Sequence, residues 1–93
     1  MEDTRYIVLI IYDISQDKQR LKVAKYLSSF GTRVQKSAFE ANLNKSQLFR
    51  LITGLEQIWK KEDNVRIYKL HSLEEIKIYG EGDYTSLEDV IVI

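Results

Sequence analysis

The chain has 93 residues, of which 14 are Lys or Arg and 14 are Asp or Glu, so its formal net charge at pH 7 is zero. This length allows one domain with a modest core, which a second copy of the chain would help to stabilise. The absence of cysteine excludes disulfides and thiolate metal sites and suits a cytoplasmic protein. No apolar run approaches the ~18–20 residues of a membrane span, and the acidic segment Met1–Thr4 argues against a secretory signal.

The first predicted element is a strand over Tyr6–Tyr12, an unbroken run of β-branched, aliphatic and aromatic residues that stops at Asp13. A run that is apolar at both parities is typical of a strand covered on both faces. A carboxylate that follows it would lie at the rim of the sheet, rigidly held but open to water. Asp13 is therefore either a ligand for a metal ion or only the residue that ends the strand, and spacing alone favours the second reading.

A polar turn over Asp13–Asp17 precedes a helix predicted over Lys18–Phe30, where apolar residues recur at helical spacing. No Asp or Glu occurs from Lys18 to Phe39, although that segment holds six Lys and Arg residues. A neutral chain can therefore still present one basic face. The candidates for non-specific contacts with nucleic-acid phosphates are Lys18, Lys22 and Lys25, and the alternative is an ordinary solvated helix surface.

The segment Thr32–Leu43 predicts two short strands or one bent strand, because apolar and polar residues alternate in its second half. A second helix is predicted over Leu48–Trp59, with Asn44 or Ser46 as its cap, and a strand follows over Val65–Leu70. The order βαββαβ is typical of an α+β, ferredoxin-like sandwich. In that topology the first strand is central and both helices cover one face of the sheet.

The other face of such a sheet would be bare, yet the first strand is apolar on that side too. We therefore expect a homodimer in which two sheets pack face to face. Residues 1–79 would form the ferredoxin-like domain, including a short fifth strand near Glu75–Tyr79. Residues 80–93 would form a tail with an apolar end, Val90–Ile93. Unless it pairs with a sheet edge, this end would promote aggregation, and we expect the edge to be the partner's.

A face-to-face dimer could place two copies of Asp13 opposite each other. Two adjacent carboxylates repel each other, and a Mg²⁺ or Mn²⁺ ion, which prefers oxygen ligands, would relieve the repulsion. Such an ion could polarise a phosphodiester and activate water. The lone histidine, His71, has no obvious catalytic partner and is more typical of a surface residue.

Four segments in this order carry a resemblance to a known family: Val8–Ser15, Asp17–Leu21, Arg33–Glu40 and Val65–Leu70. The combination of Tyr-Asp-Ile-Ser after an apolar strand and Gln-x-Ser-x-Phe-Glu after the first helix resembles the CRISPR-associated Cas2 family. That family is the non-integrase subunit of the spacer-acquisition complex.

The resemblance implies a ferredoxin-like homodimer with metal-dependent endonuclease activity on single-stranded RNA or double-stranded DNA. It implies that Asp13 of each subunit is the catalytic residue and the ligand for Mg²⁺ or Mn²⁺. It further implies a dimer that bridges CRISPR integrase subunits and holds duplex DNA through basic residues. Gln19 stands where many relatives have a second basic residue. Positions that match others linked with activity or nucleic-acid contact are Arg20, Arg33, Ser37 and Phe39.

Each of these residues also has an interpretation that does not depend on the resemblance. Arg20 and Arg33 could hold phosphates or form surface salt bridges, and Ser37 could donate to a phosphate or close the strand bend. Phe39, like Tyr12, suits core or dimer packing, as do Val90, Ile91 and Val92 in the tail. No exposed aromatic series indicates base stacking, so the backbone of a duplex is a better expected ligand than a single strand.

Two further functions stay open on the same fold, because fold alone does not determine function. One is a stand-alone ribonuclease toxin, which a neighbouring antitoxin gene would indicate. The other is a non-enzymatic dimer that senses a small molecule between its subunits, which would need a polar pocket at the interface.

Overall fold

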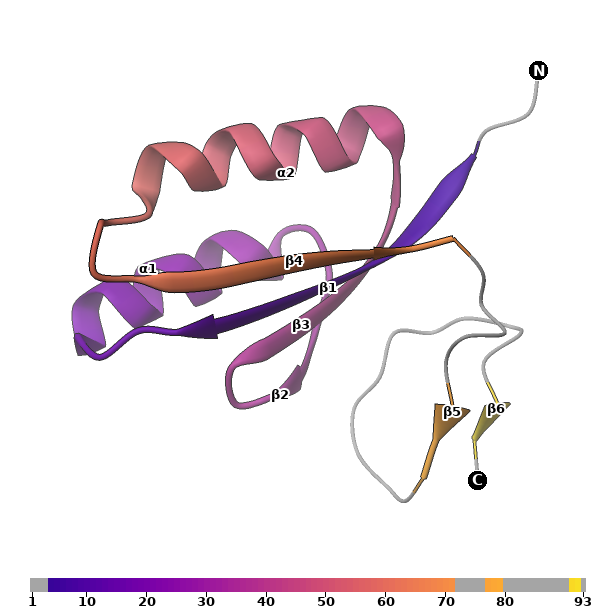
Figure 1. Cartoon of the computed structure of the whole chain (residues 1–93), viewed down its shortest axis with the longest axis horizontal. Coiled ribbons are helices and arrows are strands. Elements are labelled where there is room, and N and C mark those ends of the chain that lie inside the picture. The colour runs from indigo at the N-terminus through magenta and orange to yellow at the C-terminus, as the bar shows by residue number, and fades with distance from the viewer. Residues whose placement is uncertain (1–3, 72–76, 80–90, 93) are drawn as a thin grey trace.

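The computed structural model describes residues 4–71, 77–79 and 91–92. Its main body has the predicted βαββαβ order, shown in Figure 1. The elements are β1 (Arg5–Asp13), α1 (Asp17–Ser28), β2 (Thr32–Gln35), β3 (Ala38–Asn44), α2 (Lys45–Ile58) and β4 (Asn64–Leu70). The α+β fold class is confirmed.

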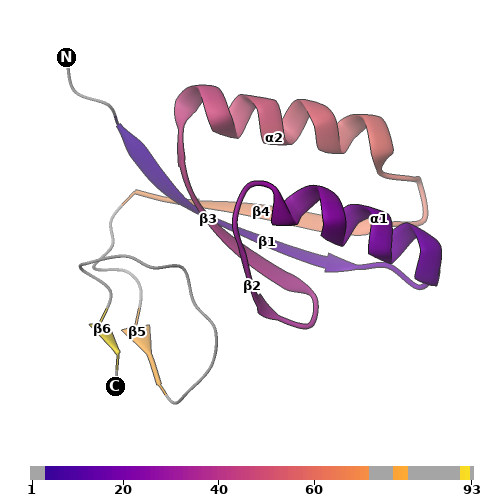
Figure 2. The same cartoon turned by 180° about the vertical axis from the view of Figure 1, so that it is seen from behind.

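The main sheet has four strands in the order β2-β3-β1-β4, with β1 paired antiparallel to both β3 and β4. Ile10 lies at its centre, opposite Phe39 on one side and Ile67 on the other. Both helices cover the same face of this sheet, as Figures 1 and 2 show from opposite sides. The central position of β1 explains its apolar sequence and confirms the prediction.

The core lies between the sheet and the two helices. Val8, Ile10 and Tyr12 of β1 point into it, because alternate residues of a strand face the same side. They meet the apolar side of α1 and α2 and the inward residues of β3. The fully buried side chains at its centre are Tyr12, Phe39, Ile10, Leu27, Leu51, Val8 and Val23.

On the opposite face of the sheet, the described part of the chain places no helix, and we call this side the open face. Leu9, Ile11 and Asp13 of β1 alternate with the core residues and lie on this side, together with Arg66 and Tyr68 of β4. Ile11 is 40% exposed and Tyr68 is 44% exposed. An apolar strip at the middle of an open face is what a packed second layer would cover, so the dimer stays a prediction that this face supports.

The two helices begin differently. Asn44 caps α2 through a reciprocal pair of bonds, in which Asn44 Oδ1 accepts from the Gln47 backbone N–H at 2.8 Å and Gln47 Oε1 accepts from the Asn44 N–H at 2.9 Å. At α1 the cap residue is Gln16, whose side chain makes no cap bond. Asp17 in the first turn instead places a negative charge at the positive end of the helix.

The helix α1 ends at Ser28, two residues before the predicted end, and the chain then turns sharply towards β2. Gly31 sits in that turn against β3: a Cβ atom on it would lie 2.1 Å from the Glu40 carbonyl oxygen. Close approach of two backbones explains this glycine.

A second, two-stranded sheet pairs β5 (Lys77–Ile78) in parallel with β6 (Ile91–Val92). The predicted fifth strand is therefore present at residues 77–78. Val90 and most of the predicted tail over 80–93 lie outside the described residues. Pairing of the tail with a partner's sheet stays a prediction. None of the helices in the described part of the chain is long and apolar enough to cross a membrane.

Candidate nucleic-acid and metal site

Asp13 is the last residue of β1, exposed and opposite Asn64 of β4. Its neighbour Tyr12 points into the core, so the alternation of the strand sets the Asp13 carboxylate on the open face. Among the described residues, no side chain or backbone group forms a hydrogen bond or ion pair with that carboxylate. Its oxygens are therefore available to a ligand.

A metal ion would find only part of its ligand set in one chain. Within the described residues, no three His, Cys, Asp or Glu side chains come together. Mg²⁺ is commonly held by one or two carboxylates, with water and phosphate oxygens completing its shell. The exposed, unengaged Asp13 carboxylate fits an ion shared with a second copy of the chain better than one held by a single chain.

The turn between β2 and β3 is held against the end of β1. The Tyr12 N–H donates to the Ser37 carbonyl at 3.0 Å, and the Tyr12 hydroxyl donates to the Lys36 carbonyl at 3.3 Å. Arg33 Nη2 donates to the same Lys36 carbonyl at 2.8 Å. The turn that carries Ser37, with Arg33 bonded to it, is thereby held at the end of β1 that carries Asp13.

Arg20 reaches the same end of the sheet from α1. Its Nη1 donates to the Ile14 carbonyl at 3.0 Å, and its Nη2 forms an ion pair with Asp17. Arg20 therefore fastens the loop that follows Asp13. We call this end of the sheet the β1 rim; it comprises Asp13, Arg20, Arg33, Lys36 and Ser37.

Lys18, Lys22 and Lys25 are all exposed on α1. Their spacing places them along one side of the helix, which we call the lysine stripe. The helix covers the core face of the sheet, whereas Asp13 lies on the open face. In one chain, the lysine stripe and the Asp13 carboxylate therefore face different directions.

Phe39 and Tyr12 lie in the core, with ring centroids 6.2 Å apart and planes stacked at 29°. Both point towards the helices and away from the open face. His71 follows β4 at the opposite end from Asp13, since Asp13 pairs with the first residue of β4 and Ile7 with the last. The His71 ring packs edge-on against Tyr6, with centroids 5.6 Å apart.

Gln19 has a role that sequence reasoning missed. It is only 5% exposed, and its Nε2 donates to the Ile58 carbonyl at 2.7 Å and to Asp63 Oδ2 at 2.8 Å. The side chain joins α1 to the end of α2. Its spacing from Val23 and Leu27, four and eight residues on, is the signal that marks Gln19 as inward-facing.

Arg66 is the second residue that sequence reasoning missed. It is exposed on the open face, directly opposite Ile11 and two pairs along from the pair of Asp13 with Asn64. Val65 and Ile67 on either side pack against the core, so the alternation of this strand marks Arg66 as outward-facing. A cation beside the Asp13 carboxylate suits a site that handles a phosphate.

The family model for the CRISPR associated protein Cas2 matches residues 6–76. A curated relative from Mycobacterium tuberculosis, named CRISPR-associated endoribonuclease Cas2, is 42% identical over 87 residues, which span 94% of this chain and 77% of the relative. A crystal structure of a hypothetical protein from Thermus thermophilus superposes with a TM-score of 0.76 at 30% identity, covering 88% of this chain and 99% of that one.

One solved structure that resembles the chain is part of an assembly. It is described as a partial Cas6–RT–Cas1–Cas2 complex, and the match has a TM-score of 0.61 at 30% identity, covering 69% of this chain and 77% of that one. The matched family segment spans β1 to β4, including Asp13 and the rest of the β1 rim. The chain belongs to the CRISPR-associated Cas2 family.

Proposed function

We propose that this protein acts in CRISPR spacer acquisition as a homodimer that binds duplex nucleic acid, and that it cleaves phosphodiester bonds with paired Asp13 residues and Mg²⁺ or Mn²⁺. Family membership, the endoribonuclease name of the relative and the Cas1-containing complex of another support this assignment. The observation that carries it is the Asp13 carboxylate, which is exposed at the β1 rim and has no partner among the described residues.

The open face supports the dimer. Ile11 and Tyr68 remain substantially exposed at its middle, and an apolar layer of that kind is costly to leave in water. If two open faces meet around a two-fold axis, each contributes one Asp13. The partial metal site of one chain would then be completed by the other.

The basic residues suit the phosphate backbone of a nucleic acid. The lysine stripe offers exposed ammonium groups without any neighbouring Asp or Glu in the sequence from 18 to 39. Arg33 and Lys36 at the β1 rim and Arg66 on the open face extend the positive charge towards Asp13. Contacts of this type make affinity fall steeply with salt concentration.

The residues of the chain have distinct roles in cleavage. Asp13 and its copy would hold the ion, which when bound neutralises phosphate charge and activates water. Arg66 would orient the phosphate beside Asp13. Arg20 and Arg33 act as positioning residues, because their hydrogen bonds to the Ile14 and Lys36 carbonyls fasten the loop after Asp13 and the Lys36–Ser37 turn.

Replacing Asp13 tests the cleavage assignment. Asp13→Asn should lower the rate of Mg²⁺-dependent cleavage of single-stranded RNA and duplex DNA at least ~100-fold, because the neutral amide is a poor ligand for a hard cation. Folding should be unchanged, since the side chain is exposed. The measurement is cleavage of labelled substrates over a Mg²⁺ and Mn²⁺ series, with circular dichroism as a check.

Glu56→Gln is the matched control, since Glu56 is an exposed carboxylate on α2, on the face of the sheet opposite to Asp13. Cleavage that persists in Asp13→Asn would refute the assignment. Duplex binding is tested separately by gel shift across a salt series. Absence of binding even at low salt would refute the nucleic-acid role.

A further inference from the structure

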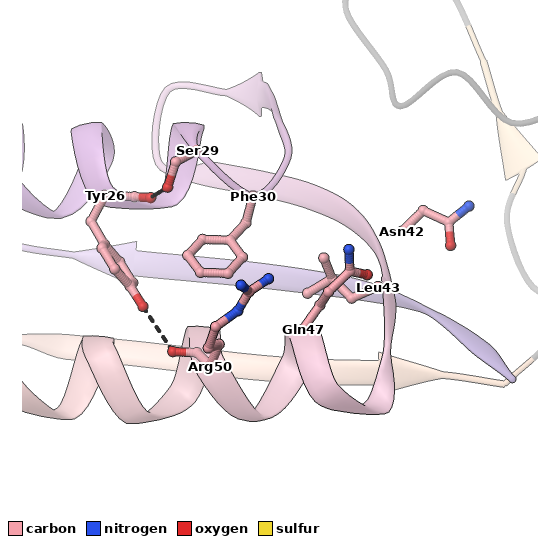
Figure 3. Close-up of a pocket in the computed structure, with 7 residues that line it drawn as sticks. All are labelled: Tyr26, Ser29, Phe30, Asn42, Leu43, Gln47 and Arg50. Atoms are coloured by element: carbon pink, nitrogen blue, oxygen red, sulfur yellow. Dashed lines mark hydrogen bonds between the residues drawn. The ribbon is translucent and has the colours of Figure 1, made fainter. Parts of the chain in front are cut away.

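A cavity on the helix side of the molecule has no part in the proposed function. It has a volume of about 470 Å³ and lies between the end of α1 and the first half of α2, over β3. This volume is within the ~300–1,000 Å³ range of sites that take small molecules. Figure 3 shows its lining: Tyr26, Ser29 and Phe30 come from α1 and the turn after it, and Gln47 and Arg50 come from α2.

The cavity offers a free hydrogen-bond donor on Gln47. Gln47 Oε1 accepts from the Asn44 N–H and from Arg5 Nη2 at 2.9 and 3.4 Å, which leaves its amide nitrogen available to donate. No acceptor among the described residues contacts that nitrogen. Asn42 pairs with Ile7, so its side chain lies on the open face and points away from the other lining residues (Figure 3).

Arg50 adds a positive charge. Its exposed side chain extends from α2 towards Phe30 at the end of α1 (Figure 3), and its guanidinium has no acceptor among the described residues. None of the residues that line the cavity is acidic. A ligand that satisfies an amide donor and a guanidinium is an anion rich in acceptor oxygens, for which phosphate is the natural group.

The wall beside Arg50 is aromatic. Phe30 lines the cavity, with its ring centroid 5.2 Å from that of Tyr26 and the planes tilted at 58°. The Tyr26 hydroxyl is turned away, because it donates to the Arg50 and Leu51 carbonyls. An aromatic ring that lines a cavity next to an anion-binding group is the arrangement that accepts a base and its phosphate together.

The lysine stripe leads to this cavity. Successive steps of four, three and four residues run from Lys18 through Lys22 and Lys25 to Ser29, which follow one line on a helix of 3.6 residues per turn. Ser29 is a lining residue. A nucleic-acid backbone that lies along the stripe would therefore bring its end to the mouth of the cavity.

We propose that the cavity between α1 and α2 binds a single nucleoside phosphate, with the base against Phe30 and the phosphate on Arg50 and Gln47. The nucleotide would be either free or the unpaired terminal residue of a nucleic acid on the lysine stripe. The second source rests on the proposed function, whereas the binding chemistry does not.

The first arm of the test uses small probes and the full chain. We expect AMP to bind and to shift amide resonances of residues around the cavity, whereas adenosine, which lacks the phosphate, binds at least ~10-fold more weakly. Arg50→Gln should lower AMP affinity about tenfold, and Phe30→Leu should lower it at least about fivefold through lost stacking. Arg50→Lys should retain part of the affinity.

Lys61→Gln is the matched control, because it removes one exposed positive charge from the turn before β4, remote from the cavity lining. It should leave AMP affinity unchanged. Equal losses in Arg50→Gln and Lys61→Gln would mean diffuse charge attraction and would overturn the proposal. Absence of AMP binding and of any overhang effect would overturn it too.

The second arm separates the two sources of the nucleotide. A labelled duplex with one unpaired terminal nucleotide should bind several-fold more tightly than its blunt counterpart, and Arg50→Gln should remove only that gain. Neutralising the lysine stripe should weaken both duplexes. AMP binding without an overhang gain assigns the site to a free nucleotide, and AMP binding by a chain that binds no duplex upholds the site while rejecting the proposed nucleic-acid role.

Discussion

At the scale of single residues, side chains at the β1 rim divide into those that hold the structure and those that are left open. Arg20 donates a hydrogen bond to the Ile14 carbonyl, and Arg33 donates one to the Lys36 carbonyl. The Asp13 carboxylate, by contrast, has no partner among the described residues. The arginines therefore determine the shape of the rim, and any phosphate they contact must share them with those carbonyls. Gln19, by contrast, is wholly structural.

Gln19→Leu should destabilise the protein by about 1–3 kcal/mol, because the Ile58 carbonyl and the Asp63 carboxylate would each lose a donor in a buried setting. The measurement is urea unfolding followed by circular dichroism. Gln57→Leu, an exposed substitution on α2, should change stability by less than about 0.5 kcal/mol. Equal effects of the two substitutions would contradict the bridging role of Gln19.

At the scale of secondary-structure elements, α1 and α2 are joined through Tyr26 and Gly54. The Tyr26 hydroxyl donates to the Arg50 and Leu51 carbonyls, both at 3.0 Å. It can do so because Gly54 has no side chain: a Cβ atom there would lie 2.1 Å from that hydroxyl. Burial raises the pKa of Tyr26, and the nearby Arg50 partly offsets this shift. A glycine inside a helix therefore serves the contact between two helices.

Gly54→Ala should destabilise the protein by about 1–3 kcal/mol through this clash, although alanine favours a helix by about 1 kcal/mol over glycine. In a Tyr26→Ala background the obstacle is gone, so the same substitution should become stabilising. Thermal unfolding of the wild type, the two single variants and the double variant measures both effects. A penalty of equal size in both backgrounds would contradict the steric explanation.

The sequence was sufficient for the order of elements and the placement of Asp13, because strand alternation and helical spacing are local patterns. Val8, Ile10 and Tyr12 alternate with Leu9 and Ile11 along β1, and their inward direction is what sets Asp13 on the other side. The bonds of Arg20, Arg33 and Gln19 depend on which elements meet in three dimensions, and no local pattern carries that information. The sequence therefore marked Gln19 only as a position where many relatives have a basic residue, and its role between α1 and α2 could not be predicted.

At the scale of the whole molecule, one face of the sheet is covered by helices and the other is open. The open face has apolar side chains at its middle and charged ones at its end, where Asp13 and Arg66 lie. This arrangement suits a dimer interface with the candidate site at its edge. The lysine stripe faces away from this side. A dimer joined through its open faces would thus carry the two stripes on its outside, where a long ligand can reach them.

Ile11→Lys should disrupt the dimer, because it places a charge in the middle of the predicted interface. We expect the sedimentation coefficient at micromolar concentration to fall to that of a monomer. Leu21→Lys is the control, since Leu21 is 68% exposed on α1 and lies on the other side of the sheet. Wild-type sedimentation as a monomer, or identical behaviour of both variants, would reject an interface through the open face.

Tyr12 and Asp13 are neighbours in the chain with opposite environments: Tyr12 is 2% exposed and bonded to the Lys36 carbonyl, and Asp13 is exposed at the surface. Tyr12 supplies the rigidity, so the carboxylate is placed accurately without contributing to the fold itself. Selection can therefore act on the two residues independently. A descendant could lose the carboxylate, and any cleavage that depends on it, and still inherit the intact fold.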